Sequence, residues 1–237
     1  MLSDAELQSL APFPLVRVPG AEVFETWQEL RQRPGVAPVL LGTPDSTTVL
    51  LKLAQLATDT TESVVEGALK LDVDAWMAER IRANPEIFDL AEVDFPWDGA
   101  QRRVVPFIPA LDHRGEPYPQ VIFGLMPAEE PWLAPIHLRT PGVALCPNSA
   151  VHTALCRRWY ERYGAVLSTI ADGVIEFQLE TPIATLEVAR QVALEHFVYC
   201  PDGVHQNYVT LGNSAAALML NRSWYFWWEL DVHERPE

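Results

Sequence analysis

The sequence is short of cysteines, of lysines and of long apolar runs. Its three cysteines are an odd number at low density, which excludes a disulfide framework. No apolar run approaches the roughly 18 residues that a membrane-spanning helix needs. The 17 cations, of which only Lys52 and Lys70 are lysines, face 32 acids, and the formal charge is −15. Because nucleic acids and anionic membranes attract clustered cations, neither is an expected partner.

The remaining composition is that of a folded protein. Apolar residues make up 49% of the 237 positions, which is enough for a sizeable core. The first residues, Met1 to Glu6, carry acids where a signal peptide carries cations, and no apolar stretch follows them. We therefore predict a cytoplasmic protein. The acidic excess suits solubility, or a basic protein partner.

The N-terminal half alternates helical and strand patterns. Ser3 and Glu6 form a capping-box pattern that predicts a helix at its start. Apolar spacing and breaker residues predict helices at 3–10, 21–32, 45–57, 61–71 and 73–83. They predict strands at 15–18, 38–42, 103–108 and 120–126, of which 103–108 is an edge strand because it contains a proline. Residues 85–119, in which acids surround Phe95-Pro96-Trp97, are expected to form a long, proline-stiffened connection.

Residues 146–230 carry the clearest pattern. Gly164 is expected to end a helix that begins at Pro147-Asn148, because glycine readily adopts the left-handed conformation found after helices. Asp172-Gly173 supplies the positive φ angles of a type I′ turn and predicts a hairpin of strands 165–171 and 174–180. In the second strand apolar and polar residues alternate, which predicts one buried and one wet face.

An aromatic run, residues 223–230, closes this unit. Two helices are expected before it, one from Thr185 to Tyr199 and one at 211–221, with a polar loop at 201–209 between them. The run holds three of the eight tryptophans within five positions, and we interpret it as a central strand covered on both faces. The predicted order of the unit is α-β-β-α-α-β.

Together the elements predict an α+β fold, with a mixed or antiparallel sheet and helices packed mainly on one face. The expected division is an N-terminal α/β region at 1–126, a proline-rich connection at 127–145 and a C-terminal α+β domain at 146–237. The N-terminal strands can also extend the C-terminal sheet, and the two regions would then form one domain.

Several short blocks, in this order, resemble one family. They are Cys-Pro at 146–147, a histidine at 152, an aromatic and charged block at 158–165, Tyr-Cys-Pro-Asp at 199–202 and aromatic residues at 224–228. Residues 146–230 are thereby similar to the bacterial domain of unknown function DUF4253, and residues 18–21 and 38–42 resemble full-length members. After Asp202 the family continues with an aliphatic pair and Asp-Gln-Gly, whereas this chain has Gly-Val-His-Gln-Asn. The resemblance implies no activity, because none is assigned to the family.

Two expected helices place cysteine and histidine side chains four residues apart. His152 and Cys156 lie on one helix, and His196 and Cys200 on another, so that each pair shares a helix face. If the helices pack side by side, the four side chains can converge on a structural zinc ion, with Cys146 nearby. The alternative is ordinary packing, since free cysteine behaves as a small hydrophobe.

Cys200 is also a candidate nucleophile, with His196 or His205 as its base. Such a thiol needs a lowered pKa. The C-terminal end of a helix raises the pKa of a thiol instead, because that end of the dipole is negative. We therefore predict no catalytic residue and no cofactor.

The candidate binding residues are the polar loop and the aromatic and arginine side chains expected near it. Loops on a rigid scaffold commonly carry sites, and Arg158 and Arg162 are spaced to clamp a carboxylate or phosphate. Each candidate also has a structural interpretation as surface loop, core or solvated helix face. The candidates for ligand or partner binding are Trp159, Arg162, Tyr199, Asp202, His205, Gln206, Trp224 and Trp228.

Two functions fit this pattern. The preferred one is a non-catalytic acidic module that binds a basic protein, as an immunity protein that neutralises a toxin does. The alternative is an enzyme or small-ligand-binding protein whose pocket is lined by the tryptophans and the 202–208 loop. The first predicts one contiguous acidic face, and the second predicts a deep pocket with converging polar groups.

Overall fold

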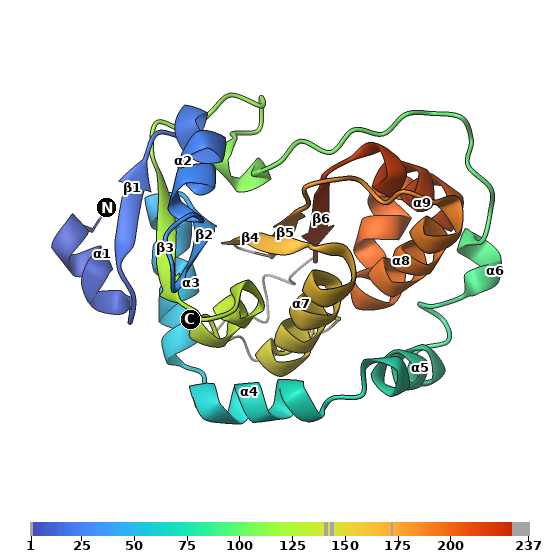
Figure 1. Cartoon of the computed structure of the whole chain (residues 1–237), viewed down its shortest axis with the longest axis horizontal. Coiled ribbons are helices and arrows are strands. Elements are labelled where there is room, and N and C mark those ends of the chain that lie inside the picture. Colours follow the sequence, from blue (N-terminus) through green and yellow to red (C-terminus); the bar gives the residue numbers. More distant parts are fainter. Residues whose placement is uncertain (1, 140–141, 143–144, 172, 229–237) are drawn as a thin grey trace.

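One mixed sheet runs through the molecule (Figure 1). The computed structural model describes residues 2–139, 142, 145–171 and 173–228. Within these residues six strands follow the order β1-β3-β2-β4-β5-β6. The strands are β1 (Leu15–Val18), β2 (Val36–Gly42), β3 (Val121–Pro127), β4 (Val166–Ala171), β5 (Val174–Gln178) and β6 (Ser223–Trp227).

The two halves of the chain meet inside this sheet. β2 and β4 pair in parallel, with Leu40 opposite Thr169, and the other neighbours pair antiparallel. The sheet is therefore continuous across the predicted connection at 127–145, which contains the 3₁₀-helix η3 (Pro131–His137). The predicted α+β fold is confirmed, and the division into domains stays a prediction.

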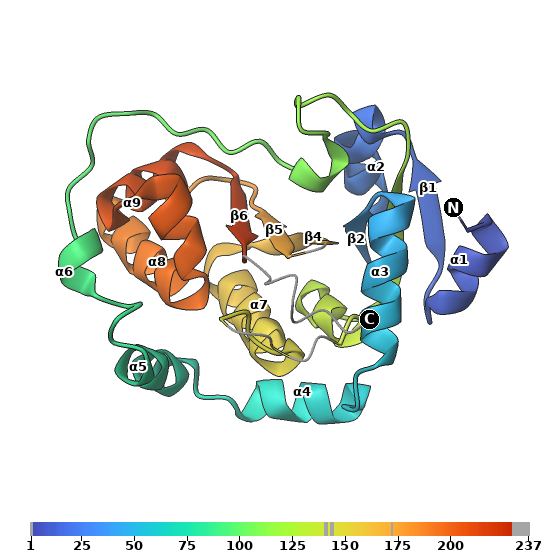
Figure 2. The ribbon, with the colours of Figure 1, turned by 180° about the vertical axis from the view of Figure 1, so that it is seen from behind.

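Helices cover the sheet mainly on one face (Figures 1 and 2). On that face Val39, Leu41 and Ile122 pack in one core cluster with residues of α3, α7 and α8. On the opposite face Leu40 and Phe123 pack in a second cluster with α2. The helices are α1 (Asp4–Leu10), α2 (Val23–Leu30), α3 (Pro44–Gln55), α4 (Thr61–Lys70), α5 (Val73–Ala83), α6 (Leu90–Val93), α7 (Ser149–Tyr163), α8 (Leu186–Tyr199) and α9 (Leu211–Leu220).

Local sequence signals set the ends of these elements. Ser3 and Glu6 form the predicted capping box of α1. Thr185 caps α8 through the backbone N–H of Val188. Gly164 follows α7 with a φ of 67°, as predicted. In the hairpin turn Gly173 has a φ of 70°, and Asp172 lies outside the described residues.

Two strand predictions are wrong. β6 lies at the edge of the described sheet and pairs with β5, whereas the aromatic pattern predicts a central strand. Helices bury Trp224 and Phe226 on one face, while Tyr225 on the other stays partly exposed, so that the aromatic run gains its cover from helices more than from strands. Residues 103–108 form no strand, and residues 229–230 of the predicted strand lie outside the described part.

A third difference between prediction and structure concerns the burial of β5. Residues 94–110, which we name the strap, explain it. The strap runs from α6 past α9 and across to the sheet (Figure 2). The amide of Gly212 binds the carbonyl of Phe95, the amide of Val104 binds the Asn221 side chain, and the amide of Ile108 binds Glu176. The second strand of the hairpin is consequently buried on both faces, and the predicted wet face is wrong.

Trp159 of α7 lies at the centre of the C-terminal core. Its side chain is fully buried and stacks on Phe226 with a centroid distance of 5.4 Å and an interplanar angle of 4°. The edges of Phe177, Tyr199 and Trp224 meet it. One indole therefore contacts residues of α8, β5 and β6.

Replacing Trp159 with alanine should lower the free energy of unfolding by about 3–5 kcal/mol, because it leaves a large cavity. Trp97→Ala is the matched control, because its side chain is 51% exposed and surface changes usually cost within about 0.5 kcal/mol. Urea denaturation measures both variants, and equal losses would contradict the central position of Trp159.

Candidate functional site

The aromatic candidates are core residues. Trp159, Tyr199, Trp224 and Trp228 are at most 2% exposed, and their rings contact one another within one cluster. Side chains packed in this way leave no open wall for a ligand. The tryptophans thus hold α7 and α8 against the sheet, and the described structure favours this role over the predicted pocket lining.

Arg162 belongs to a charge cluster around Glu195. The buried Glu195 carboxylate accepts hydrogen bonds from Arg158 at 2.7 Å and from the indole N–H of Trp159 at 2.8 Å, with Arg162 at 3.5 Å. Arg158 also binds Asp74 of α5 and thereby holds the pKa of that carboxyl below its usual value. The cluster joins α5, α7 and α8, so Arg158 and Arg162 already have an internal carboxylate as their partner.

Glu195→Gln should lower the free energy of unfolding by about 3–5 kcal/mol, because it leaves buried cationic and N–H groups without their anion. Glu187→Gln makes the same change at an exposed position of the same helix. It should cost only the roughly 0.3–1 kcal/mol of a helix-dipole interaction. Thermal unfolding compares the two, and similar losses would contradict the role of Glu195.

The cysteine and histidine candidates do not come together as one metal site. His152 lies beside Cys146, with 3.8 Å between Nε2 and Sγ, and its Nδ1 is 2.7 Å from the Tyr199 hydroxyl. His196 packs instead between Trp224 and Phe226, and no described residue hydrogen-bonds its Nε2. Among the described residues no three His, Cys, Asp or Glu side chains are grouped as metal ligands. Aromatic rings fill the space in which His196 would have to meet the other ligands.

Cys156 and Cys200 are buried, Cys146 is partly buried, and all three thiols are neutral. Burial raises the pKa of Cys146 and of Cys200 to about 12, and it also raises that of Cys156. Burial lowers the pKa of His152 and of His196 to about 3, so both rings are neutral. The Cys200 thiol donates to the Trp227 carbonyl at 3.0 Å. This environment opposes the thiolate that a nucleophile needs.

Alkylation by iodoacetamide at pH 8 should therefore be slow. Because only the thiolate reacts, we expect the folded protein to react about 100-fold more slowly, or slower still, than the urea-denatured chain. Mass spectrometry of the cysteine peptides measures each thiol. Rapid labelling of Cys200 in the folded protein would restore the nucleophile hypothesis.

The predicted polar loop is helical. Residues Gly203–Tyr208 form a π-helical turn, η4, between α8 and α9. His205 contacts the ring of Phe197 and the carbonyl of Ile87, whereas Gln206 is exposed and Asp202 is half-buried. Of the predicted binding residues, His205 and Gln206 thus reach the surface together.

Val209 directly follows this turn in a strained conformation. Its φ of 68° and ψ of −37° are unusual for a β-branched residue. Its amide binds the carbonyl of Val204 at 2.6 Å, and its side chain is 60% exposed. An exposed apolar side chain thus follows a π-helical turn on a strained backbone. Both π-helical turns and backbone strain are concentrated at functional sites.

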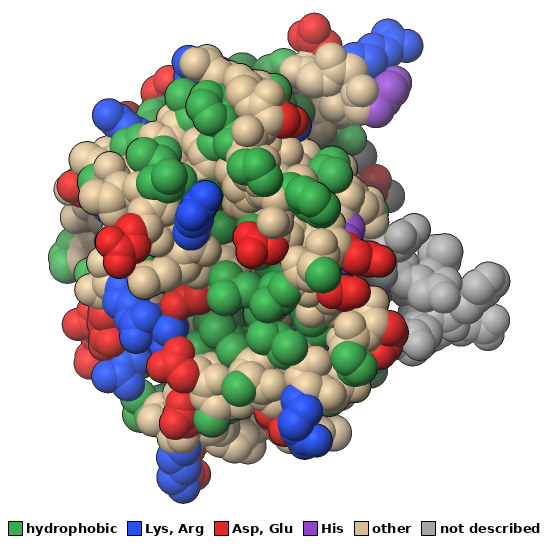
Figure 3. Space-filling view, turned by 90° about the vertical axis from the view of Figure 1, so that its right-hand side faces the viewer, with side chains coloured by type: hydrophobic (Ala, Val, Ile, Leu, Met, Phe, Trp, Pro, Cys, Tyr) green, Lys and Arg blue, Asp and Glu red, His purple; other side chains and the backbone are tan. Residues whose placement is uncertain are grey.

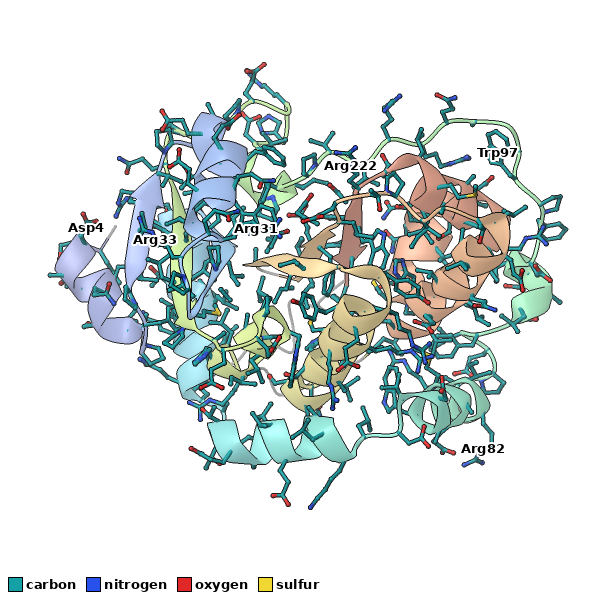
Figure 4. The ribbon with its side chains drawn as sticks, in the orientation of Figure 1. Asp4, Arg31, Arg33, Arg82, Trp97 and Arg222 are labelled. Atoms are coloured by element: carbon teal, nitrogen blue, oxygen red, sulfur yellow. The ribbon has the colours of Figure 1, made fainter. Side chains whose placement is uncertain are left out.

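Other exposed hydrophobic side chains lie on neighbouring segments. Phe95 and Trp97 of the strap are 54% and 51% exposed, and Leu90 of α6 is 39% exposed. Trp97 lies at the outer edge of the molecule, on the strap beyond α9 (Figure 4). We name Leu90, Phe95, Trp97 and Val209 the apolar face.

A hydrogen-bonded frame fixes the apolar face. A Cβ at Gly212 would collide with the strap backbone from Phe95 to Trp97, so a glycine is required where the strap crosses α9. Asn213 accepts from the Asp98 amide at 3.0 Å and donates to the Tyr208 carbonyl at 2.9 Å. The strap, η4 and α9 are thereby locked together, and Phe95, Trp97 and Val209 project from rigid backbone.

Acidic residues accompany the apolar face. Residues 84–101 contain five acids and no lysine or arginine. Figure 3 shows the side of the molecule that lies on the right in Figure 1, where hydrophobic side chains gather near the middle and both acidic and basic side chains lie around them. Of the five, Asp98 is paired with Arg102 at 2.6 Å. The combination suits a partner that brings apolar groups and positive charge.

Fold and surface together define an α+β protein whose core helices are held by aromatic rings and whose outer side carries a rigid apolar face. Residues 122–229 match the model of the family described as domain of unknown function (DUF4253), and this stretch of the chain belongs to that family. The predicted family is confirmed, with a start inside β3 rather than at residue 146. Neither a curated protein nor a solved structure matches the chain.

The exposed aromatic residues of the strap were not among the candidates that the sequence indicated. Phe95 and Trp97 stand among prolines and acids, a pattern that we interpreted as a connection. Large aromatic residues in a segment without helical or strand periodicity are a signal for exposed contacts, because such a segment cannot bury them regularly. Neither Val209 nor Gly212 carries a sequence signal, since Val209 follows an irregular π-helical turn and Gly212 meets the distant strap backbone.

Proposed function

We propose that this protein is a non-catalytic protein-binding module and that the apolar face is its binding surface. The observation that carries the proposal is a set of exposed apolar side chains on a strained, hydrogen-bonded frame. Val209 keeps an unfavourable conformation while its side chain is 60% exposed. Strain of this kind costs about 1–3 kcal/mol and persists where the surrounding structure enforces it, commonly at functional sites.

Aromatic side chains that project from rigid backbone suit binding. Tryptophan and other aromatic residues supply much of the affinity at protein interfaces, and fewer than about a third of interface residues usually matter. Because Asn213 and Gly212 fix the strap, Phe95 and Trp97 lose little freedom when a partner covers them. His205 and Gln206 adjoin Val209 along the chain and supply polar groups for a rim.

Charge indicates the class of partner. The acids of residues 84–101 and the formal charge of −15 favour a basic protein over nucleic acid or an anionic membrane. An immunity protein that neutralises a basic toxin is one binder of this kind, and the proposed place of action is the cytoplasm. Among the residues that the structure describes, no helix has the length and hydrophobicity to cross a bilayer.

The test places a photo-crosslinking amino acid at Trp97 and, as the control, at Leu56, which is 66% exposed next to α3. We expect one basic protein to crosslink from position 97 and not from 56. With that protein purified, Trp97→Ala and Phe95→Ala should each weaken binding roughly 30-fold, as hot-spot residues do. Leu56→Ala should leave the Kd within about twofold. Binding that is indifferent to Trp97 would overturn the proposal.

Val209→Gly separates stability from binding. Glycine adopts positive φ without strain, and the relief of about 1–3 kcal/mol exceeds the roughly 0.5–1 kcal/mol of extra chain entropy. The variant should therefore be about 1 kcal/mol more stable and yet bind the partner more weakly, because it loses an exposed apolar contact. Denaturation and calorimetry measure the two quantities, and unchanged binding would remove Val209 from the surface.

A further inference from the structure

Glu176 is a buried acid in the middle of the C-terminal strands. It lies on β5, opposite Thr169 of β4 and Tyr225 of β6, and is 1% exposed. Its side chain points to the face that the strap covers, since the amide of Ile108 donates to its Oε1 at 2.9 Å. The sheet thus holds the end of the strap through one carboxyl group.

The backbone of the strap is shaped around this carboxyl. Phe107 has a φ of 58°, which is left-handed and strained for a bulky side chain, and it starts the 3₁₀-helix η2 (Ile108–Ala110). The turn gives Glu176 hydrogen bonds from the backbone of both Phe107 and Ile108, a concave arrangement that suits an acidic oxygen. The Phe107 ring packs on Trp27 with a centroid distance of 5.9 Å.

Glu176 has no cationic partner in the part of the chain that the structure describes. Among the described residues it takes part in no ion pair, and its side-chain partner is the hydroxyl of Thr169 at 2.6 Å. The titratable group that faces it is the phenol of Tyr225, and the strap offers it backbone amides of Phe107 and Ile108. Burial raises the pKa of Glu176 to about 7, although the hydrogen bonds from Thr169, Ile108 and Phe107 lower it.

We propose that Glu176 is a latch for the strap, which holds residues 105–110 on the sheet while its carboxyl is neutral and releases them when the carboxyl ionises. In the neutral form Oε1 accepts from the Ile108 amide and Oε2 accepts from the Thr169 hydroxyl, so both oxygens have partners and no charge is buried. In the ionised form a charge without a counter-ion is buried, and lifting the strap hydrates it.

Proton linkage gives the direction in which pH changes the opening of the strap and the pH range over which it does so. The open strap exposes Glu176 and returns its pKa to the ordinary value of 4.5, against about 7 when closed. Below pH 4.5 both forms are protonated and the closed state has its full stability. The opening constant then rises about tenfold per pH unit up to pH 7 and levels off above it.

Hydrogen–deuterium exchange of the Phe107 and Ile108 amides between pH 5 and 8.5, corrected for intrinsic exchange rates, tests the latch. In the native sequence the protection factors should fall about tenfold per pH unit up to pH 7 and then level off. In Glu176→Gln, which keeps an acceptor but cannot ionise, they should not change with pH. The control Glu180→Gln, at a carboxyl 87% exposed beyond β5, should behave like the native sequence.

A titration of the native protein covers the case in which Glu176→Gln does not fold. The side-chain carboxyl carbon of Glu176, followed by NMR, should titrate near pH 7 together with the Ile108 amide. An ordinary Glu176 titration would overturn the latch. Protection that does not change with pH in the native chain would overturn it as well, and so would an equal change in Glu176→Gln.

Discussion

Several polar contacts in the C-terminal half depend on the buried indole N–H group of Trp159. An unpaired buried donor is costly, and the indole N–H of Trp159 has an acceptor, whereas those of Trp224 and Trp228 have none among the described residues. The acceptor is Glu195, and a buried carboxylate in turn requires cations, which Arg158 and Arg162 supply. Arg158 then reaches Asp74 of α5. A single aromatic side chain thus accounts for a chain of polar contacts that fixes three helices.

On the other face of the sheet, polar contacts fix the strap in the same way. It has no regular hydrogen bonding of its own over most of its length, and the amide groups of Asn213 and Asn221 and the carboxyl of Glu176 satisfy its backbone. These three side chains fix the position of an irregular segment that has no strand partner among the described residues. Its aromatic residues can therefore stay exposed in a fixed position, which a mobile connection would not allow.

Local signals predicted most elements, since caps, breakers and turns act within a few residues. Gly164, Thr185 and the Ser3 capping box are examples, and the order of the C-terminal unit followed from them. The alternation of apolar and polar residues along β5 indicated a solvent-exposed face. It shows which side chains are polar, but it does not show whether another segment covers them. The cover comes from residue 108, which is 68 positions away from Glu176. Only the family resemblance linked distant blocks, and it carries no geometry.

The order of the strands also has a consequence for the growing chain. β1 ends at Val18, yet it pairs with β3, which begins at Val121, and β2 waits for the same strand. Loop closure over such spans is slow, and unpaired strands are prone to aggregate while they wait. During synthesis the first two strands leave the ribosome long before their neighbour exists. Helices α4 and α5 pack on α7 and α8, so they also wait for the C-terminal half of the chain.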